Sequence, residues 1–415
     1  MESEANLAVK EQLVLHPNSH FNGTVQVPGS KSISNRVLLM AHLAEGESEF
    51  PGILESDDTR YMREALENIK NKKNELFLGN AGTAMRSLTA ALCVGNGQYI
   101  LRGEPRMHER PIKDLVDALR FLGANIEYLG NEGFPPLKIN ASGLLGGVVH
   151  IKGNISSQFL TAILIAAPYC KEPLKIIVDG ELISKPYVYM TLHLMEKFGI
   201  KVENNDYRSF KIEKGVYKGQ TLKIEGDASS ASYFFAGAAI TKGNVVVKGV
   251  EKDGLQGDVM FLDVLQKMGP DLEGITVDAT LFPDAAMTIC PVACYAKGKT
   301  KITGIASWKV KETDRISAMA NELRKIGAEV ADGDDFIEIT PPNTIKPATI
   351  ETYNDHRMAM CFSLLSLNSP RKNGAEITIL NPSCVNKTFP EYFKEFERLH
   401  TFPEQHTITA SASCT

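Results

Sequence analysis

The chain has 415 residues, of which 43% are hydrophobic and 23% are charged, and its formal net charge is −5. This length exceeds what one ordinary hydrophobic core accommodates, so two domains are expected. The acidic balance and the single tryptophan argue against a nucleic-acid-binding protein, and no apolar run approaches the length of a membrane span.

One pattern recurs six times along the chain. A turn of Gly, Asn or Asp with small or hydroxyl residues runs into an Ala- and Leu-rich stretch that predicts a buried helix. The six starts are Gly29–Arg36, Gly79–Arg86, Gly153–Gln158, Gly226–Ala231, Phe282–Met287 and Tyr353–Met358. β-branched strands that end near a glycine follow at Tyr99–Gly103, Ile176–Gly180, Val245–Gly249 and Thr300–Gly304.

A second, more amphipathic helix follows in most of these units and ends just before a glycine. The sequence therefore predicts an α/β fold of six βαβαββ-like repeat units. The interval between the first and second of the six starts is short, because strand patterns are missing between Asn68 and Glu75. The interval between the fourth and fifth starts is also short, because it is compressed between Met268 and Phe282. Units one and four are expected to be shortened.

The six helix starts predict an anion-binding cleft. A helix N-terminus presents unpaired N–H groups and about half a positive charge, so converging starts favour phosphate or carboxylate. Any single serine there is more simply an N-cap. That explanation fails for Lys31, Arg36 and Arg357, because a cation at a helix N-terminus opposes the helix dipole.

Three acid–base candidates lie among these cations: Asp284, Glu312 and His356. Taken alone, Asp284 could be an N-cap, Glu312 part of a solvated salt-bridge run, and His356 a packed core histidine. Their occurrence together at equivalent loop or helix-start positions favours a functional site instead.

The seven cysteines are scattered, odd in number and without a CxxC pair. Cys290 and Cys294 lie four apart, but no His or further Cys stands nearby to complete a metal site, so reduced thiols and no metal are expected. Met1 to Lys10 carries no apolar signal core, and a cytoplasmic location is the default expectation. The tail from Thr401 to Thr415 is predicted to be disordered.

Five stretches of the chain carry a family resemblance: Val27–Ser32, Leu76–Arg86, Arg106–Pro111, Val310–Arg315 and Tyr353–Met360. Together they strongly resemble the signatures of 5-enolpyruvylshikimate-3-phosphate (EPSP) synthases, and the likeness runs from about Leu13 to about Phe396. The resemblance implies transfer of the enolpyruvyl group of phosphoenolpyruvate to the 5-hydroxyl of shikimate 3-phosphate. This reaction lies on the shikimate pathway to chorismate and the aromatic amino acids, and it needs no metal or organic cofactor.

The family fold implies two globular domains of three repeats each that close on the substrates. When the family's domain division is transferred to this chain, residues 1–29 and 228–415 form a discontinuous domain that bears Asp284, Glu312, His356 and Lys387. Residues 30–227 form the inserted domain. A cytoplasmic monomer is expected, with small-molecule substrates and neither a nucleic-acid nor a membrane partner.

Residue by residue, the resemblance assigns two substrate sites and a catalytic set. The shikimate 3-phosphate site is Lys31, Ser32, Arg36, Ser156, Ser157, Gln158, Ser184, Tyr187, Asp284 and Lys311. The phosphoenolpyruvate site is Lys31, Gly82, Arg110, Gln158, Arg315, His356, Arg357 and Lys387, with Asn80 and Thr83 shaping the wall. The catalytic set is Asp284, Glu312, Lys31, Lys387 and His356.

The chain departs from the family pattern in three ways. Ser87 follows Arg86 where glyphosate-sensitive members usually have proline, and Ser307 stands where relatives usually place an asparagine ligand. Relatives also carry longer segments in the two short intervals. The missing segments leave a catalytically impaired anion-binding homologue as one alternative.

The sister transferase that acts on UDP-N-acetylglucosamine is the second alternative. That family uses a cysteine in a mobile loop as general acid. The corresponding loop here, Arg106–Pro111, has no cysteine, which argues against this activity.

Overall fold

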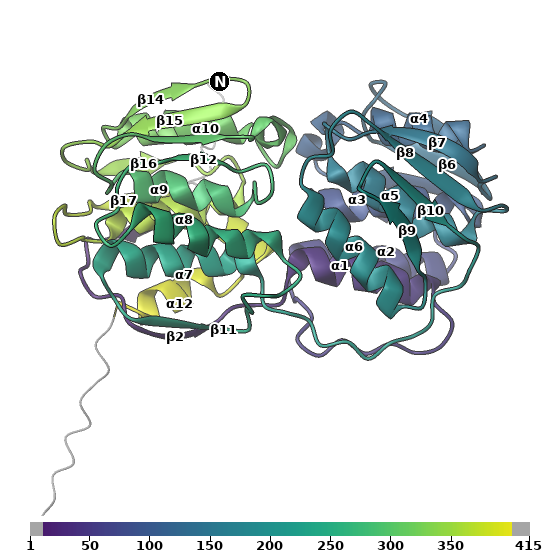
Figure 1. Cartoon of the computed structure of the whole chain (residues 1–415), viewed down its shortest axis with the longest axis horizontal. Coiled ribbons are helices and arrows are strands. Elements are labelled where there is room, and N and C mark those ends of the chain that lie inside the picture. The colour runs from purple at the N-terminus through teal and green to yellow at the C-terminus, as the bar shows by residue number, and fades with distance from the viewer. Residues whose placement is uncertain (1–10, 401–415) are drawn as a thin grey trace, which may run out of the picture.

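The computed structural model describes residues 11–400, so the predicted disordered tail and the first ten residues lie outside the described part of the chain. It shows a mixed α/β fold with two domains side by side (Figure 1). We call the part from the first helix, α1, to the tenth strand, β10, the inserted domain and the remainder the terminal domain. No described helix is long and apolar enough to cross a membrane.

The inserted domain is a continuous stretch of chain. Its elements are α1 (Lys31–Leu43), α2 (Asp57–Lys70), β3 (Glu75–Phe77), α3 (Gly82–Cys93), β4 (Asn96–Arg102), the 3-10 helix η1 (Pro105–Glu109), α4 (Lys113–Phe121), β5 (Asn125–Tyr128), β6 (Leu137–Ser142), β7 (Gly147–Lys152), α5 (Ser157–Ala166), η2 (Ala167–Tyr169), β8 (Leu174–Asp179), α6 (Lys185–Lys197), β9 (Val202–Asn205) and β10 (Ser209–Ile212).

The terminal domain begins with β1 (Gln12–Leu15) and β2 (Gly23–Gln26) and resumes after the inserted domain. Its later elements are α7 (Ala228–Thr241), β11 (Val245–Lys248), η3 (Gly257–Met260), α8 (Phe261–Met268), β12 (Thr276–Asp278), η4 (Ala285–Thr288), α9 (Ile289–Ala293), β13 (Thr300–Thr303), η5 (Ala306–Val310), α10 (Arg315–Lys325), β14 (Glu329–Asp332), β15 (Phe336–Thr340), β16 (Ala348–Ile350), α11 (His356–Ser363), η6 (Leu364–Ser366), β17 (Ile377–Leu380), η7 (Pro382–Lys387) and α12 (Tyr392–Arg398).

Three sheets share one design. Their strand orders are β3-β4-β6-β5, β7-β8-β10-β9 and β12-β13-β15-β14. In each, the first pair is parallel and the other two pairs are antiparallel. The other two sheets are smaller: β1-β17-β16 has three strands and β11-β2 has two. No strand lies between α1 and α2 or between α2 and β3 in the described chain.

The buried apolar side chains form two separate cores. One core joins Leu15–Val27 to residues 231–399, and the other lies within residues 33–224. The first helices bury nearly all their surface, as predicted: every residue of α3 is buried, because small side chains let α5 pack closely against it.

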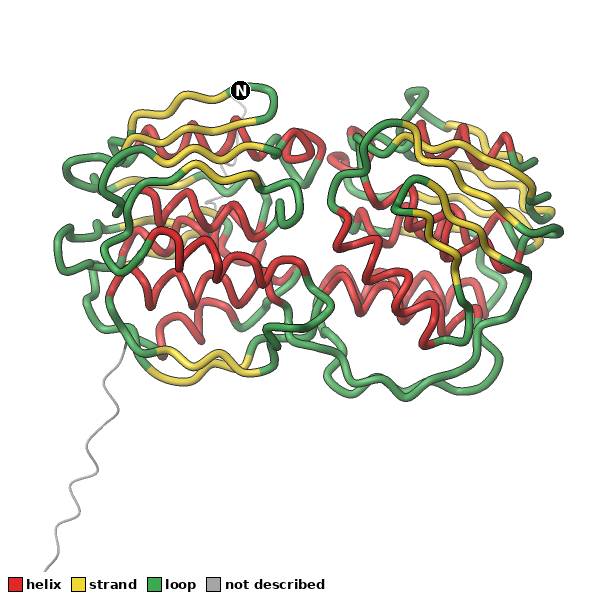
Figure 2. The backbone as a smooth tube through the Cα atoms, in the orientation of Figure 1, coloured by secondary structure: helices red, strands yellow, loops and turns green. Residues whose placement is uncertain are grey.

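The chain crosses between the domains twice, through loops on one side of the molecule, at the bottom of Figure 2. The two crossings pair with each other: Ser30 N donates to Glu225 O at 2.7 Å, and Asp227 N donates to Pro28 O at 2.8 Å. Gly29 is required here because a Cβ at this position would lie 2.1 Å from Gly52 O. These crossings bring the N-termini of α1 and α7 together at the domain interface.

Candidate active site

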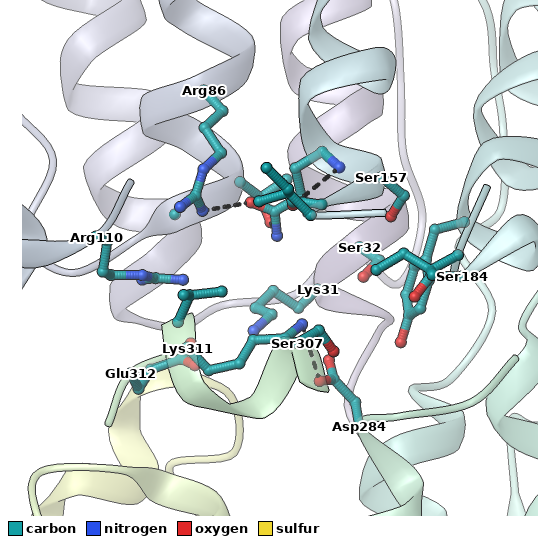
Figure 3. Close-up of a pocket in the computed structure, with 18 of the residues that line it drawn as sticks. Lys31, Ser32, Arg86, Arg110, Ser157, Ser184, Asp284, Ser307, Lys311 and Glu312 are labelled. Atoms are coloured by element: carbon teal, nitrogen blue, oxygen red, sulfur yellow. Dashed lines mark hydrogen bonds and ion pairs between the residues drawn. The ribbon is translucent and has the colours of Figure 1, made fainter. Parts of the chain in front are cut away.

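A cavity lies between the two domains, with side chains of both pointing into it (Figure 3). The N-terminal turns of α1, α3 and α5 form one wall, and the loop before η4 and the end of η5 form the other. The lining residues are Lys31, Ser32, Arg36, Asp58, Gly82, Thr83, Arg86, Arg110, Ile155, Ser156, Ser157, Gln158, Ile183, Ser184, Tyr187, Asp284, Ser307, Val310, Lys311 and Glu312.

Three of the six predicted helix starts therefore open directly into the cavity. The fifth start forms the 3-10 helix η4 rather than an α-helix, and places Asp284 at its N-cap. The starts of α7 and α11 lie behind the wall but contact it: Asp227 Oδ2 accepts from Lys31 N at 3.2 Å, and Arg357 Nη2 donates to Asp284 Oδ2 at 3.2 Å.

The lining carries five cations and three carboxylates, so it attracts anions. Arg36 is buried, and its guanidinium donates to Thr191 Oγ1 at 2.9 Å and to Ser32 O at 2.8 Å. No described carboxylate lies within ion-pair distance of Arg36, and burial lowers its pKa to about 10. A buried cation with only neutral partners favours an anionic ligand beside it.

Gly82 lets two more guanidinium groups approach the start of α3. A Cβ at this position would lie 2.5 Å from Arg110 Nη2 and 2.7 Å from Arg86 Nη1. Arg110 is held by Asn80, which accepts from Nη1 through its backbone and side-chain oxygens at 2.8 and 2.9 Å. Arg86 Nη1 donates to Gln158 Oε1 at 2.6 Å. The glycine thus makes room for two guanidinium groups that lie on the cavity wall, where they attract anions.

Asp284 is surrounded by cations. Its carboxylate lies 3.3 Å from Lys311 Nζ, 3.1 Å from Arg315 Nη1 and 3.2 Å from Arg357 Nη2. Burial alone would raise the pKa of Asp284, but Lys311, Arg357, Arg315 and Lys31 together hold it well below its usual range. The group is therefore ionised.

Glu312 lies at the end of the same wall. Its Oε2 is 2.8 Å from Arg315 Nη2, and its Oε1 is 3.8 Å from Lys387 Nζ. Burial acts to raise the pKa of this carboxyl, and the neighbouring cations, led by Arg315 and Arg110, lower it well below the usual value. Asp284 and Glu312 thus share one buried guanidinium, Arg315, whose Nε also bonds Asp355 Oδ2 at 2.7 Å.

Four predicted site residues lie behind the cavity wall rather than on it: Arg315, His356, Arg357 and Lys387. His356 is fully buried, and neither ring nitrogen has a hydrogen-bond partner in the described structure, although Nδ1 lies 3.3 Å from Asp355 Oδ1. Burial and the charges of Arg357 and Lys31 lower its pKa well below 6.5, so the ring is neutral. Asn80, expected to shape the wall, does not line the cavity either but holds Arg110, and the other predicted residues line it.

Ser156 illustrates how a cap and a site residue coincide. Its hydroxyl accepts from Gln158 N at 3.3 Å and so caps α5, as the simpler interpretation of the sequence expected. The same side chain lines the cavity. The two interpretations are therefore compatible.

Two charged lining residues were missing from the predicted site: Arg86 and Asp58. Arg86 had a signal, because it is a cation in the first turns of α3, where it opposes the helix dipole. Asp58 had none, because an acid at the start of α2 is what the dipole of any helix favours. Ser307, which stands where relatives usually place an asparagine ligand, also lines the cavity.

Several bonds cross the domain interface around the cavity. Tyr187 OH donates to Asp258 Oδ2 at 2.8 Å, Arg106 Nη2 donates to Lys311 O at 3.1 Å, and Ser184 N donates to Thr280 O at 3.2 Å. These bonds hold the two walls in register.

Asp258 makes this interface sensitive to pH. Burial, with the nearby charge of Asp284, raises the pKa of Asp258 to about 6. An acid whose folded-state pKa exceeds its unfolded value of about 3.9 destabilises the fold as pH rises from about 4 to 6, by about 1–3 kcal/mol once ionised. Asp258→Asn should therefore be more stable than the wild type at pH 8, and the difference should vanish near pH 4.

Thermal unfolding at both pH values measures this effect. Asp263→Asn, an exposed acid on the following helix, is the matched control. A stability difference that is the same at pH 4 and pH 8 would contradict the assignment.

Comparison with known proteins gives one consistent result. The family model described as EPSP synthase (3-phosphoshikimate 1-carboxyvinyltransferase) matches residues 15–76 and 68–396. A 3-phosphoshikimate 1-carboxyvinyltransferase of Marinomonas sp. (strain MWYL1) is 51% identical over 426 residues, covering 93% of this chain and 99% of that protein. The enzyme of the same name from Shewanella amazonensis is 52% identical, covering 94% and 99%.

Solved structures agree with these relatives. The EPSP synthase of Acinetobacter baumannii superposes with a TM-score of 0.76 at 26% identity, covering 94% of this chain and 98% of that one. The Marinomonas alignment spans 426 positions, more than the 415 residues of this chain. Relatives therefore contain segments with no counterpart here, as the two short intervals suggested.

Proposed function

The chain belongs to the EPSP synthase family, and from that premise we propose how its interdomain cavity performs the family's reaction. It transfers the enolpyruvyl group of phosphoenolpyruvate to the 5-hydroxyl of shikimate 3-phosphate, giving 5-enolpyruvylshikimate 3-phosphate and phosphate. The observation that carries the proposal is a cavity with an excess of cations around two ionised carboxylates.

Shikimate 3-phosphate occupies the hydroxyl-rich end of the cavity. Arg36, which has only neutral partners, and the serines at the start of α5 are suited to its phosphate. The proposed contacts are Lys31, Ser32, Arg36, Ser156, Ser157, Gln158, Ser184, Tyr187, Asp284 and Lys311.

Phosphoenolpyruvate occupies the end beside Gly82, where Arg110 and Lys31 face the open space. A carboxylate and a phosphate on three carbons carry dense negative charge, which several cations must offset. Gln158 supplies a neutral contact. Arg315, His356, Arg357 and Lys387 act from behind the wall and reach the ligand through small shifts of the two domains.

Asp284 is the proposed base for the first step. It accepts the proton of the 5-hydroxyl as that oxygen attacks C2 of phosphoenolpyruvate. The surrounding cations keep it ionised beforehand, and the negative charge that the substrates bring to these cations raises its proton affinity. C3 gains a proton in the same addition, so that the tetrahedral intermediate carries a methyl group. Elimination then removes one methyl proton and the phosphate.

Glu312 is the proposed partner at C3. In the unliganded cavity it is ionised because of Arg315, Arg110 and Lys387. Phosphoenolpyruvate brings negative charge to the same cations, which raises the proton affinity of Glu312 and lets it carry the proton to C3 and back. Lys31, Arg110 and Lys387 stabilise the charge on the departing phosphate.

The domain division is proposed to be residues 1–29 with 228–415, and 30–227. The paired crossings at Ser30 and Asp227 and the two separate cores support these limits. The six-repeat organisation is supported by the three sheets of identical order and by the smaller β1-β17-β16 and β11-β2 sheets. A cytoplasmic monomer remains our prediction, and the six described cysteines, all free thiols, accord with a reducing compartment.

A coupled assay of phosphate release tests the function. Phosphate should appear only when phosphoenolpyruvate and shikimate 3-phosphate are both present. Release with UDP-N-acetylglucosamine instead would indicate the sister transferase, and binding of both substrates without release would indicate an impaired homologue.

Ser87 should weaken inhibition by glyphosate. It lies buried in the second turn of α3, directly after Arg86, where the family's sensitive members have proline. Without the fixed φ of proline, the helix start shifts slightly and narrows the space near Gly82 and Thr83. The inhibition constant should therefore fall in Ser87→Pro, with a modest gain in phosphoenolpyruvate affinity. Equal constants in the two proteins would show that Ser87 has no such effect.

A further inference from the structure

Asp58 is an acid in a cavity that favours anions. It is the second residue of α2, only 2% exposed, and it lines the active-site cavity. Its neighbour Asp57 points outward, with 43% of its side chain exposed, and pairs with Arg60. A carboxylate here repels the substrates, and its burial costs free energy unless it is paired. Its contacts must therefore compensate.

Those contacts are two lysines that the proposed mechanism uses. Asp58 Oδ1 lies 2.5 Å from Lys387 Nζ, and Asp58 Oδ2 lies 3.7 Å from Lys31 Nζ. Lys31 belongs to the inserted domain and Lys387 to the terminal domain, so a single carboxylate bridges ammonium groups from both.

The bonding of Lys387 leaves one donor for a ligand. An ammonium group has three N–H donors. One is directed to Asp58 Oδ1 and a second to Asn80 O at 2.9 Å, while Glu312 Oε1 stays 3.8 Å away. Lysine side chains are long and flexible, so without these two acceptors the ammonium would have no fixed position.

We propose that Asp58 is a positioning residue for phosphoenolpyruvate: its two carboxylate oxygens hold Lys31 and Lys387 so that one phosphate group of the substrate contacts both. The inference rests on the proposed function of the site and adds a residue to it. Because the bridge joins the two domains, the position of the phosphate also depends on how the domains are placed against each other.

Asp58→Asn tests this proposal, since it removes the charge and keeps the shape. The KM for phosphoenolpyruvate should rise by at least about tenfold, with a smaller fall in kcat. The dissociation constant of shikimate 3-phosphate alone, followed by the fluorescence of the single buried Trp308, should stay within about twofold of the wild-type value. Asp58→Glu, which restores the charge, should recover part of the loss.

The neighbouring variant Asp57→Asn is the matched control and should match the wild type. An unchanged or lower KM for phosphoenolpyruvate in Asp58→Asn would make Asp58 a competing anion and overturn the proposal. Equal losses in affinity for both substrates would indicate general structural support and would also overturn it.

A double-mutant cycle tests the bridge by a second, independent comparison. The double variant Asp58→Asn/Lys387→Met removes both charges and leaves less unpaired charge buried. In the Lys387→Met background, adding Asp58→Asn should reduce phosphoenolpyruvate affinity by less than Asp58→Asn does in the wild type, because the bridge is already broken. Full additivity would contradict the bridge.

The test also separates this inference from the function itself. If the wild type released no phosphate, the proposed function would be wrong. The binding of inorganic phosphate to the wild type, Asp58→Asn and Asp57→Asn would still test whether Asp58 positions the two lysines. Weaker binding only in Asp58→Asn supports the inference, and equal binding in all three overturns it.

Discussion

Replacing Asp284 with alanine is expected to lower kcat by at least about a hundredfold while substrate binding is largely retained. The carboxylate is buried, ionised and close to three cations, and the reaction needs a base that removes the proton of the 5-hydroxyl. Without it the hydroxyl must attack in its neutral form. Single-turnover measurements with both substrates separate this chemical loss from any loss in binding.

Alanine at this position also leaves Lys311, Arg315 and Arg357 without a shared partner. Asp284→Asn controls for this in part, since it keeps the shape and one accepting oxygen but cannot accept the proton. Both variants should lose kcat to a similar extent. Near-normal turnover in either variant would refute the role of Asp284 as the base.

Glu312→Gln should likewise lower kcat by at least about a hundredfold. Glutamine can still accept a hydrogen bond from Arg315, which lies 2.8 Å from Glu312 Oε2, but it cannot carry a proton to or from C3. The loss should therefore appear in both addition and elimination. Rapid-quench analysis of product formation measures it.

Glu109→Gln is a suitable control for Glu312→Gln, because Glu109 is an exposed acid of the Arg106–Pro111 loop. Its kinetics should match those of the wild type. If Glu312→Gln kept wild-type turnover, a different group would have to transfer the proton at C3.

The motif loops were the most predictable part of the molecule. Their hydroxyls and cations follow from the needs of a helix N-terminus that binds anions, so Lys31 and Ser157 could be placed on the cavity from this pattern, while Gly82 was placed there by the family resemblance. The α/β character and the buried small-residue helices followed from periodicity in the same way.

Contacts between distant parts of the chain could not be predicted. Asp58 looks like an ordinary helix-start acid, and only the fold brings it to Lys387, 329 positions away. Arg315 was expected to bind substrate, and that its guanidinium also joins Asp284, Glu312 and Asp355 could not be foreseen from the sequence. Such roles depend on which charges the two domains bring together, and local sequence patterns do not determine that.

The most direct test of addition followed by elimination is the reaction of the wild type with both substrates in D2O, followed by proton NMR. Our account predicts a new enol ether product whose C3 methylene carries deuterium, because C3 gains a solvent-derived proton and then loses one from a methyl group. Product formation with no deuterium at C3, or no product at all, would contradict the account.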